Sequence, residues 1–166
     1  MKKHKEQNKK RGFSLIELLI VVAIILIIAA IAIPNLLRSR IAANEASAVG
    51  SLRTLNTAEI TYNTTYPNVG FACTLGALGG SGSGTATSSA AGLIDANLAS
   101  GVKSGYSFSF LSTPACSGTP AAAYGTYASP VTAGTTGQRY FCSDSSGVIQ
   151  YNTGTISTCG TNTTPI

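Results

Sequence analysis

The chain has 166 residues, of which 44% are hydrophobic and only 10% are charged, so it suits one folded domain and excludes a disordered chain. Its formal charge of +5 lies entirely in residues 1–12, which hold six of the eleven Lys and Arg residues and one of the six acidic ones. Because the remainder is neutral, no basic face for nucleic acid is indicated, and we expect no specific nucleic-acid partner.

An apolar segment follows this basic tail and runs from Phe13 to Ile33, interrupted only by Ser14 and Glu17. As an α-helix, a segment of this length spans about 31 Å, which matches the hydrocarbon thickness of a bilayer. A short run of Lys and Arg before such a segment favours the cytoplasmic side. The sequence therefore predicts a single membrane-spanning helix with a cytoplasmic N-terminus.

The helix is expected to continue beyond the apolar run, so that it extends from about Ser14 to about Tyr62. Pro34 lacks a backbone donor and predicts a kink or loosening at its position. Beyond it, a hydrophobic stripe recurs at helical spacing through Ile41, Ala48, Leu52, Leu55 and Tyr62. The accompanying polar positions are Arg38, Arg40, Glu45, Arg53 and Glu59. Residues 35–62 are interpreted as an amphipathic half-helix whose stripe packs on a globular head.

Residues 63–166 are expected to form that head. Loop chemistry runs from 63 to 91 and includes a Gly/Ser run at 79–84, and a short helical turn is predicted at 93–98. Strand-like runs follow at 106–111, 124–128, 138–142 and 148–151, and a hairpin connection separates the last two. The predicted fold class is α+β, with a long N-terminal helix packed on a small antiparallel sheet.

All four cysteines lie in the head, and none has CxxC spacing. Since His4 is the only histidine, we expect no metal site and no cofactor. An even number of cysteines behind a membrane segment favours disulfides in an oxidising compartment, with buried free thiols as the alternative. Three pairings are possible. We favour Cys142 with Cys159, which closes a loop near the C-terminus and leaves Cys73 with Cys116.

Residues 11–22 carry the most specific motif in the chain. A basic tail, the junction between Gly12 and Phe13, and Glu17 inside an apolar helix resemble the signature of type IV prepilins. Pro34, with its apolar approach, fits the same family, which includes the pseudopilins of type II secretion. The resemblance is close over about residues 10–62 and general afterwards.

This resemblance implies that residues 1–12 are a leader, which prepilin peptidase removes by cutting between Gly12 and Phe13. It also implies N-methylation of the new terminus at Phe13. Residues 13–34 would form the transmembrane and filament-core half of the helix. The subunit would contact lipid in the inner membrane, and inner-membrane machinery would then assemble it with copies of itself and other pilins into a surface pilus.

Glu17 is costly in a membrane, since a carboxylate at the centre of a bilayer costs about 2.5–3.5 kcal/mol and less near an interface. Arg11 would be removed with the leader, so it offers no partner. The new amino group of Phe13, a cation near neutral pH, lies one helical turn away. It could pair within one chain, but the family resemblance favours a neighbouring subunit. We hypothesise that Glu17 registers the incoming subunit's terminus during assembly.

Three functions stay open: a structural pilin, a periplasmic pseudopilin of type II secretion, and a membrane-anchored binding module or enzyme head. A secretory signal peptide is disfavoured because its apolar region is about 7–15 residues long. For catalysis the head offers only Ser100 and Lys103 in an S-x-x-K pattern without its partner motifs, so we expect no enzyme. We expect weak DNA binding unless a filament clusters Arg53, Lys103 and Arg139.

Overall fold

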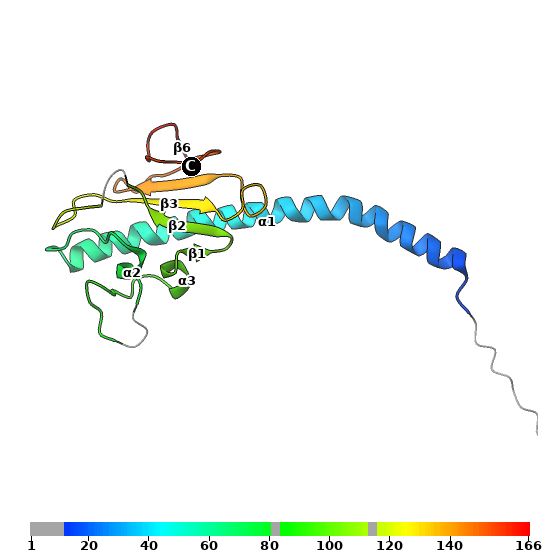
Figure 1. The fold of residues 1–166 in the computed structure, drawn as a ribbon, viewed down its shortest axis with the longest axis horizontal. Helices are drawn as coiled ribbons and strands as arrows, with labels where there is room; N and C mark the ends of the chain where they lie inside the picture. The colour runs from blue at the N-terminus through cyan, green and yellow to red at the C-terminus, as the bar shows by residue number, and fades with distance from the viewer. Residues whose placement is uncertain (1–11, 81–83, 113–115) are drawn as a thin grey trace, which may run out of the picture. The chain divides into compact units, whose positions relative to one another are not determined.

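The computed structural model describes residues 12–80, 84–112 and 116–166. The predicted leader lies outside the described residues except for Gly12, and so does the middle of the Gly/Ser run at 79–84. The chain divides into two compact units, Met1–Arg38 and Ser39–Ile166, which we describe separately. One helix, α1 (Leu15–Thr65), contributes residues to both units (Figure 1).

The described part of the first unit consists of a short non-helical lead followed by the beginning of α1. Its side chains are exposed throughout, except for a half-buried Ala29. This stretch of α1 is long and apolar enough to cross a membrane. Pro34 lies inside an unbroken helix, so the proline does not end it, and the expected kink stays a prediction.

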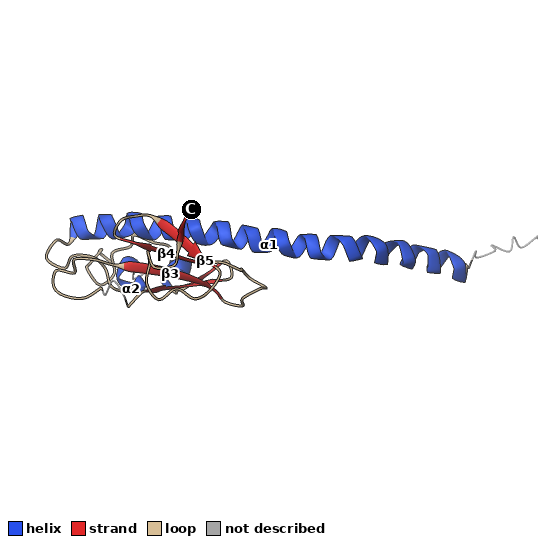
Figure 2. Ribbon diagram, turned by 90° about the horizontal axis from the view of Figure 1, so that it is seen from above, coloured by secondary structure: helices blue, strands red, loops and turns tan. Residues whose placement is uncertain are grey.

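In the second unit, α1 lies along a sheet and buries a regular stripe of side chains against it (Figures 1 and 2). The stripe recurs in alternating steps of four and three residues through Ile41, Glu45, Ala48, Leu52, Leu55, Glu59 and Tyr62. The two glutamates correct the sequence-based interpretation, which placed them among the polar positions beside the stripe. Glu45 is 6% exposed and Glu59 is 0% exposed, so both belong to the packed face.

The sheet has six antiparallel strands in sequence order. They are β1 (Val102–Lys103), β2 (Tyr106–Phe110), β3 (Gly125–Pro130), β4 (Tyr140–Asp144), β5 (Ile149–Asn152) and β6 (Thr164–Pro165). Alternate side chains of the central strands, among them Tyr106, Phe108, Ala128 and Phe141, join the α1 stripe in one hydrophobic core. The predicted α+β fold class, with a long helix on an antiparallel sheet, is confirmed.

Each predicted strand has a counterpart, but the boundaries shift for reasons of pairing. β3 extends to Pro130 because it pairs along the whole of β2. β4 begins at Tyr140 and not at Gln138, because the Gln138 and Arg139 amides donate to Glu45 on α1. The two-residue strands β1 and β6 were not predicted.

Among the residues described between α1 and the sheet, two short helices occur, α2 (Leu75–Leu78) and α3 (Ala96–Ala99). The first was not predicted. The second begins later than the predicted turn at 93–98, because Asp95 caps it by accepting a hydrogen bond from the Leu98 amide.

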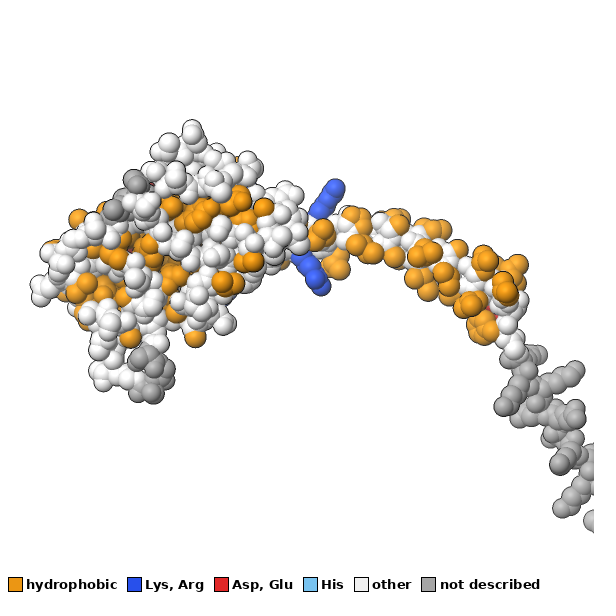
Figure 3. Space-filling view, in the orientation of Figure 1, with side chains coloured by type: hydrophobic (Ala, Val, Ile, Leu, Met, Phe, Trp, Pro, Cys, Tyr) orange, Lys and Arg blue, Asp and Glu red, His pale blue; other side chains and the backbone are white. Residues whose placement is uncertain are grey.

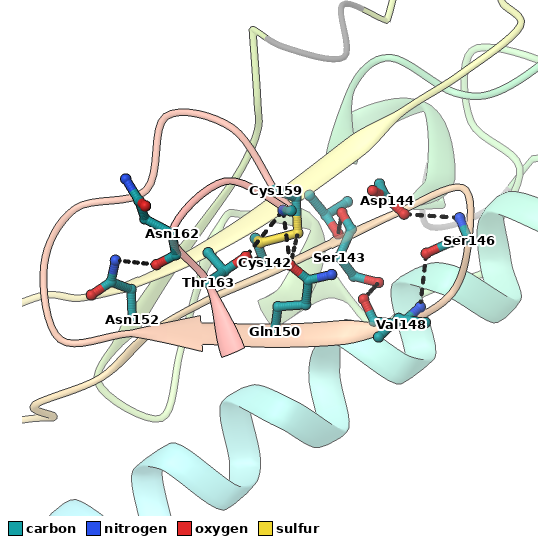
Figure 4. Close-up of a disulfide and its surroundings, with 12 residues drawn as sticks. Cys142, Ser143, Asp144, Ser146, Val148, Gln150, Asn152, Cys159, Asn162 and Thr163 are labelled. Carbon is teal, nitrogen blue, oxygen red and sulfur yellow. Dashed lines mark hydrogen bonds between the residues drawn. A yellow bond between two sulfur atoms is a disulfide. The ribbon is translucent and has the colours of Figure 1, made fainter. Parts of the chain in front are cut away.

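A second hydrophobic cluster on the sheet is centred on the disulfide between Cys142 and Cys159. Figure 4 shows Cys159 on the C-terminal segment, joined to Cys142 on β4. Gln150 on β5 adds to this attachment by accepting hydrogen bonds from the Gly160 amide and the Thr163 hydroxyl. The other disulfide joins Cys73 to Cys116. These are the two pairs that the sequence analysis favoured.

Candidate functional site

The candidate site is the start of α1, where the predicted cleavage junction and Glu17 lie close together in the sequence. Gly12, Phe13 and Ser14 are not helical, and α1 begins at Leu15. A side chain at position 12 would meet no atom of the described residues within 4 Å, so packing within them does not require a glycine there. The junction is therefore an open, non-helical segment, the kind of backbone that proteases cut.

Glu17 has a local partner that the sequence analysis missed. Its Oε2 accepts a hydrogen bond from the Ser14 backbone N–H at 2.9 Å, three residues back. Ser14 directly precedes the helix and Glu17 is its third residue, so this bond is half of a capping box. The S-x-x-E spacing of Ser14 and Glu17, present in the sequence, was the signal for this contact.

The capping contact decides where the Glu17 charge lies. The N-terminus of a helix carries partial positive charge, so a carboxylate in the first turn is stabilised there. Because Glu17 folds back toward Ser14, its charge lies at the end of the apolar segment, near the 80%-exposed Phe13. Its second oxygen, Oε1, makes no hydrogen bond among the described residues and can accept a further donor.

The apolar surface that follows this site is uncovered. From Leu15 to Leu37 the large hydrophobic side chains are 44–80% exposed. Figure 3 shows hydrophobic side chains along this part of α1 on the visible face. Contiguous apolar surface of this extent marks contact with a membrane or with other protein.

Other candidate residues are engaged elsewhere in the head. Ser100 donates to the Asn97 carbonyl, whereas Lys103 pairs with Asp95 at 2.8 Å, so the two side chains of the S-x-x-K pattern have different partners. Arg139 forms an ion pair with Glu45 at 2.7 Å.

These ion pairs bear on the proposed weak DNA binding. Of the three cations considered for clustering, Lys103 already pairs with Asp95 in the head and Arg139 pairs with Glu45 on α1, whereas Arg53 is exposed on α1. A filament would therefore have to break internal ion pairs, or rely on Arg53, to present a cationic cluster.

Comparisons with known proteins address the same N-terminal region. The family pattern described as the prokaryotic N-terminal methylation motif matches residues 7–33. The type IV major pilin protein PilA of Myxococcus xanthus (strain DK1622) is 51% identical over 51 residues, which are 31% of this chain and 23% of that relative. No solved structure matches. The resemblance predicted from the sequence is confirmed in this region, where the chain carries the methylation motif and is similar to a type IV major pilin.

Proposed function

We propose that this chain is the structural subunit of a type IV pilus. The observation that carries the proposal is the uncovered apolar part of α1, with the Gly12–Phe13 junction before it and Glu17 in its first turn. The division into leader 1–12, filament-core half 13–34, amphipathic half 35–62 and head 63–166 belongs to this proposal. The head serves as a folded body that α1 carries into the filament.

Lipid and other copies of α1 are the two environments that suit this apolar surface. Burial of one large apolar side chain is worth about 1.5–3 kcal/mol relative to water. Lipid tails are as apolar as leucine, however, so helices gain no hydrophobic energy on leaving the bilayer for a bundle. Assembly from the membrane therefore needs another contribution, which the proposed inner-membrane machinery and the Glu17 charge supply.

Cleavage by prepilin peptidase provides a positively charged amino group as a partner for the Glu17 carboxylate. Cleavage between Gly12 and Phe13 would create an amino group one residue from the Ser14 amide that Glu17 already binds. The Glu17 Oε1 atom would then accept a hydrogen bond from the N-methylated Phe13 terminus of a neighbouring subunit. Such a charge-assisted contact is strong in an apolar surrounding and sets the register of the two helices.

Mass spectrometry and N-terminal sequencing of protein sheared from the cell surface test the processing. We expect a terminus at Phe13 that carries one extra methyl group. A terminus at Ile33, or an uncut chain confined to the membrane, would contradict the proposal. Recovery of the processed chain from the periplasm alone would favour the pseudopilin of a type II secretion system.

Two substitutions at Glu17 separate its charge from its capping role. Glu17→Gln keeps a side-chain oxygen for the Ser14 amide and removes the charge, whereas Glu17→Ala removes both. We expect both variants to insert into the membrane and to lose filaments when sheared material is quantified. If Glu17→Gln assembles as efficiently as the unmodified chain and only Glu17→Ala fails, Glu17 acts as a helix cap and not in subunit registration.

A further inference from the structure

Glu45 and Glu59 lie on the same face of α1, fourteen residues or about four turns apart, yet they meet opposite environments. Glu45 accepts hydrogen bonds from the Gln138 amide at 2.9 Å, the Arg139 amide at 3.1 Å and the Arg139 Nε at 2.7 Å. Burial raises the pKa of Glu45, but these hydrogen bonds and the guanidinium charge outweigh it and hold the pKa below its usual value. Glu45 is therefore a satisfied carboxylate.

Glu59 has much less support. It is fully buried, and its Oε2 accepts one hydrogen bond, from the Ala72 amide at 2.8 Å. Its Oε1 is the one buried side-chain oxygen or nitrogen without a hydrogen-bond partner in the described part of the chain. Burial raises the pKa of Glu59 to about 8, against the lowering effect of the Ala72 hydrogen bond. A single amide does not replace the hydration that a buried carboxylate loses.

The titratable groups that face Glu59 do not supply the missing donor. They are Tyr62 on α1 and Tyr124 before β3, whose pKa values are raised, first by burial and next by the Glu59 charge. The Tyr62 hydroxyl donates to the Ser88 carbonyl and the Tyr124 hydroxyl donates to Asn56 Oδ1, so both protons are used elsewhere. Among the described cations of the head, Lys103 and Arg139 are paired with other carboxylates.

The Ala72 amide belongs to the segment that turns back after the end of α1 at Thr65 and leads directly into Cys73. Glu59 thus joins the helix to this returning segment through its hydrogen bond from the Ala72 amide. A protonated carboxyl group can keep that hydrogen bond, because one oxygen accepts from the amide and the other carries its own proton. An ionised carboxylate needs further donors, and water can supply them only if the segment separates from the helix.

We propose that Glu59 is a proton-dependent latch, which holds the segment at residues 66–72 against α1 while its carboxyl group is protonated and releases it on ionisation. The latch lies in the second unit, where α1 packs on the head, and it does not depend on the proposed pilus function. It makes the head most tightly closed in acidic to neutral medium and looser in alkaline medium.

The sign of this effect follows from proton linkage. An unfolded or opened Glu59 has its ordinary pKa of 4.5, whereas the closed form holds the proton up to about pH 8. Between these values the closed form binds one more proton, so the opening equilibrium constant rises by up to about tenfold per pH unit. The stabilisation is complete below pH 4.5 and declines as the pH rises through this window.

Hydrogen exchange at the Ala72 amide measures the latch in the full-length chain in detergent. Glu59→Gln keeps an oxygen for this amide and cannot ionise. We expect the exchange rate of the unmodified chain, divided by that of Glu59→Gln at the same pH, to rise severalfold or more between pH 6 and pH 8.5. A ratio that stays constant over this range would overturn the proposal.

Infrared spectroscopy on the same material observes the proton directly and does not depend on the variant folding. With isotope-labelled glutamate, the unmodified chain should show the carbonyl band of a protonated carboxylic acid at pH 7, and the band should disappear above pH 9. Glu45→Gln, on the same face of α1, is the matched control and should leave the band unchanged. No such band at pH 7 in the folded chain would overturn the latch.

Discussion

The first part of α1, residues 15–38 in the first unit, and the second part, residues 39–65 in the second unit, differ in how many of their side chains are buried. In the first part, Leu19 is 60% exposed and Leu26 is 63% exposed, and hydrophobic residues occur on every side of the helix. In the second part, Leu52 and Leu55 are 0% exposed, whereas Ile60 on the other side is 60% exposed. A helix that is apolar all round has no preferred side, but one with a single stripe has only one face to pack.

This difference shows where each part of the helix finds its partner. The second part is satisfied within the chain, because its stripe meets the sheet in one core. The first part has no such partner among the described residues, so its apolar surface must be covered by lipid or by other molecules. One continuous helix therefore combines an internal packing surface with an external one, and substitutions in the two parts should affect different measurements.

The largest expected effect comes from a charge in the first part. Leu26→Lys should disfavour membrane insertion by about 3–4 kcal/mol, since lysine is costly and leucine favourable at the centre of a spanning helix. Ile60→Lys is the matched control, because its side chain is exposed to a similar degree on the second part. We expect Ile60→Lys to leave insertion unchanged in a membrane-fractionation assay. Equal loss for both variants would erase the distinction between the two parts.

Truncation of a buried leucine in the second part should lower the unfolding free energy of the head. Leu52→Ala is expected to destabilise the head by about 2–5 kcal/mol, because it removes a fully buried side chain and leaves a cavity. Leu19→Ala should change the unfolding free energy of the head by less than about 0.5 kcal/mol. Denaturant unfolding, followed by a signal from the head tyrosines, measures both. A large effect of Leu19→Ala would mean that the first part also supports the head.

The ion pair between Glu45 on α1 and Arg139, the residue before β4, tests the internal packing of the second part. Glu45→Gln should cost about 1–3 kcal/mol near neutral pH, because it removes the charge from three hydrogen bonds. Since the folded pKa of Glu45 is lowered from 4.5, its stabilisation is present above that pH and is lost as the pH falls through the folded value. Thermal unfolding at pH 7 and pH 3 should therefore show a smaller difference between variant and parent in acid. A difference that grows in acid would contradict this assignment.

The smallest expected effect lies at the exposed surface of the head. Lys103→Ala should cost about 0.5 kcal/mol or less, since the pair of Lys103 and Asp95 is exposed. Asp95→Ala should cost about 1 kcal/mol, because it also removes the cap on the Leu98 amide. Thermal unfolding of the two variants gives the order, and a larger cost for Lys103→Ala would show that the ion pair outweighs the cap.

Much of the fold could be predicted from local patterns. The helix was expected over about 14–62 and extends over Leu15–Thr65, since apolar residues and a regular stripe favour it along its whole length. Four strands were expected near their observed positions because alternating and β-branched or aromatic runs are local signals. β1, β6 and α2 were missed because two to four residues carry too little pattern, and neighbouring segments stabilise them.

Of the functional residues, some could be recognised from the sequence and others could not. The Gly12–Phe13 junction and Glu17 were recognised from their spacing, and the capping contact of Glu17 could have been read from Ser14 and the S-x-x-E pattern. The burial of Glu45 and Glu59 was missed because glutamate is rarely buried and was therefore assigned to the polar face. Their spacing was the missed signal. The predicted stripe has two steps of seven residues, from Ile41 to Ala48 and from Leu55 to Tyr62, and each glutamate occupies the helical position on the same face within one of these steps.

The amino-acid sequence by itself determined the long helix, its apolar first part, the motif at its N-terminus and the antiparallel character of the head. These are properties of consecutive residues, so composition and spacing are sufficient to predict them. Only the tertiary structure decided that Glu45 meets three donors while Glu59 meets one. The partners of these two side chains come from segments that lie 13 to 94 residues away, and only folding brings such segments together.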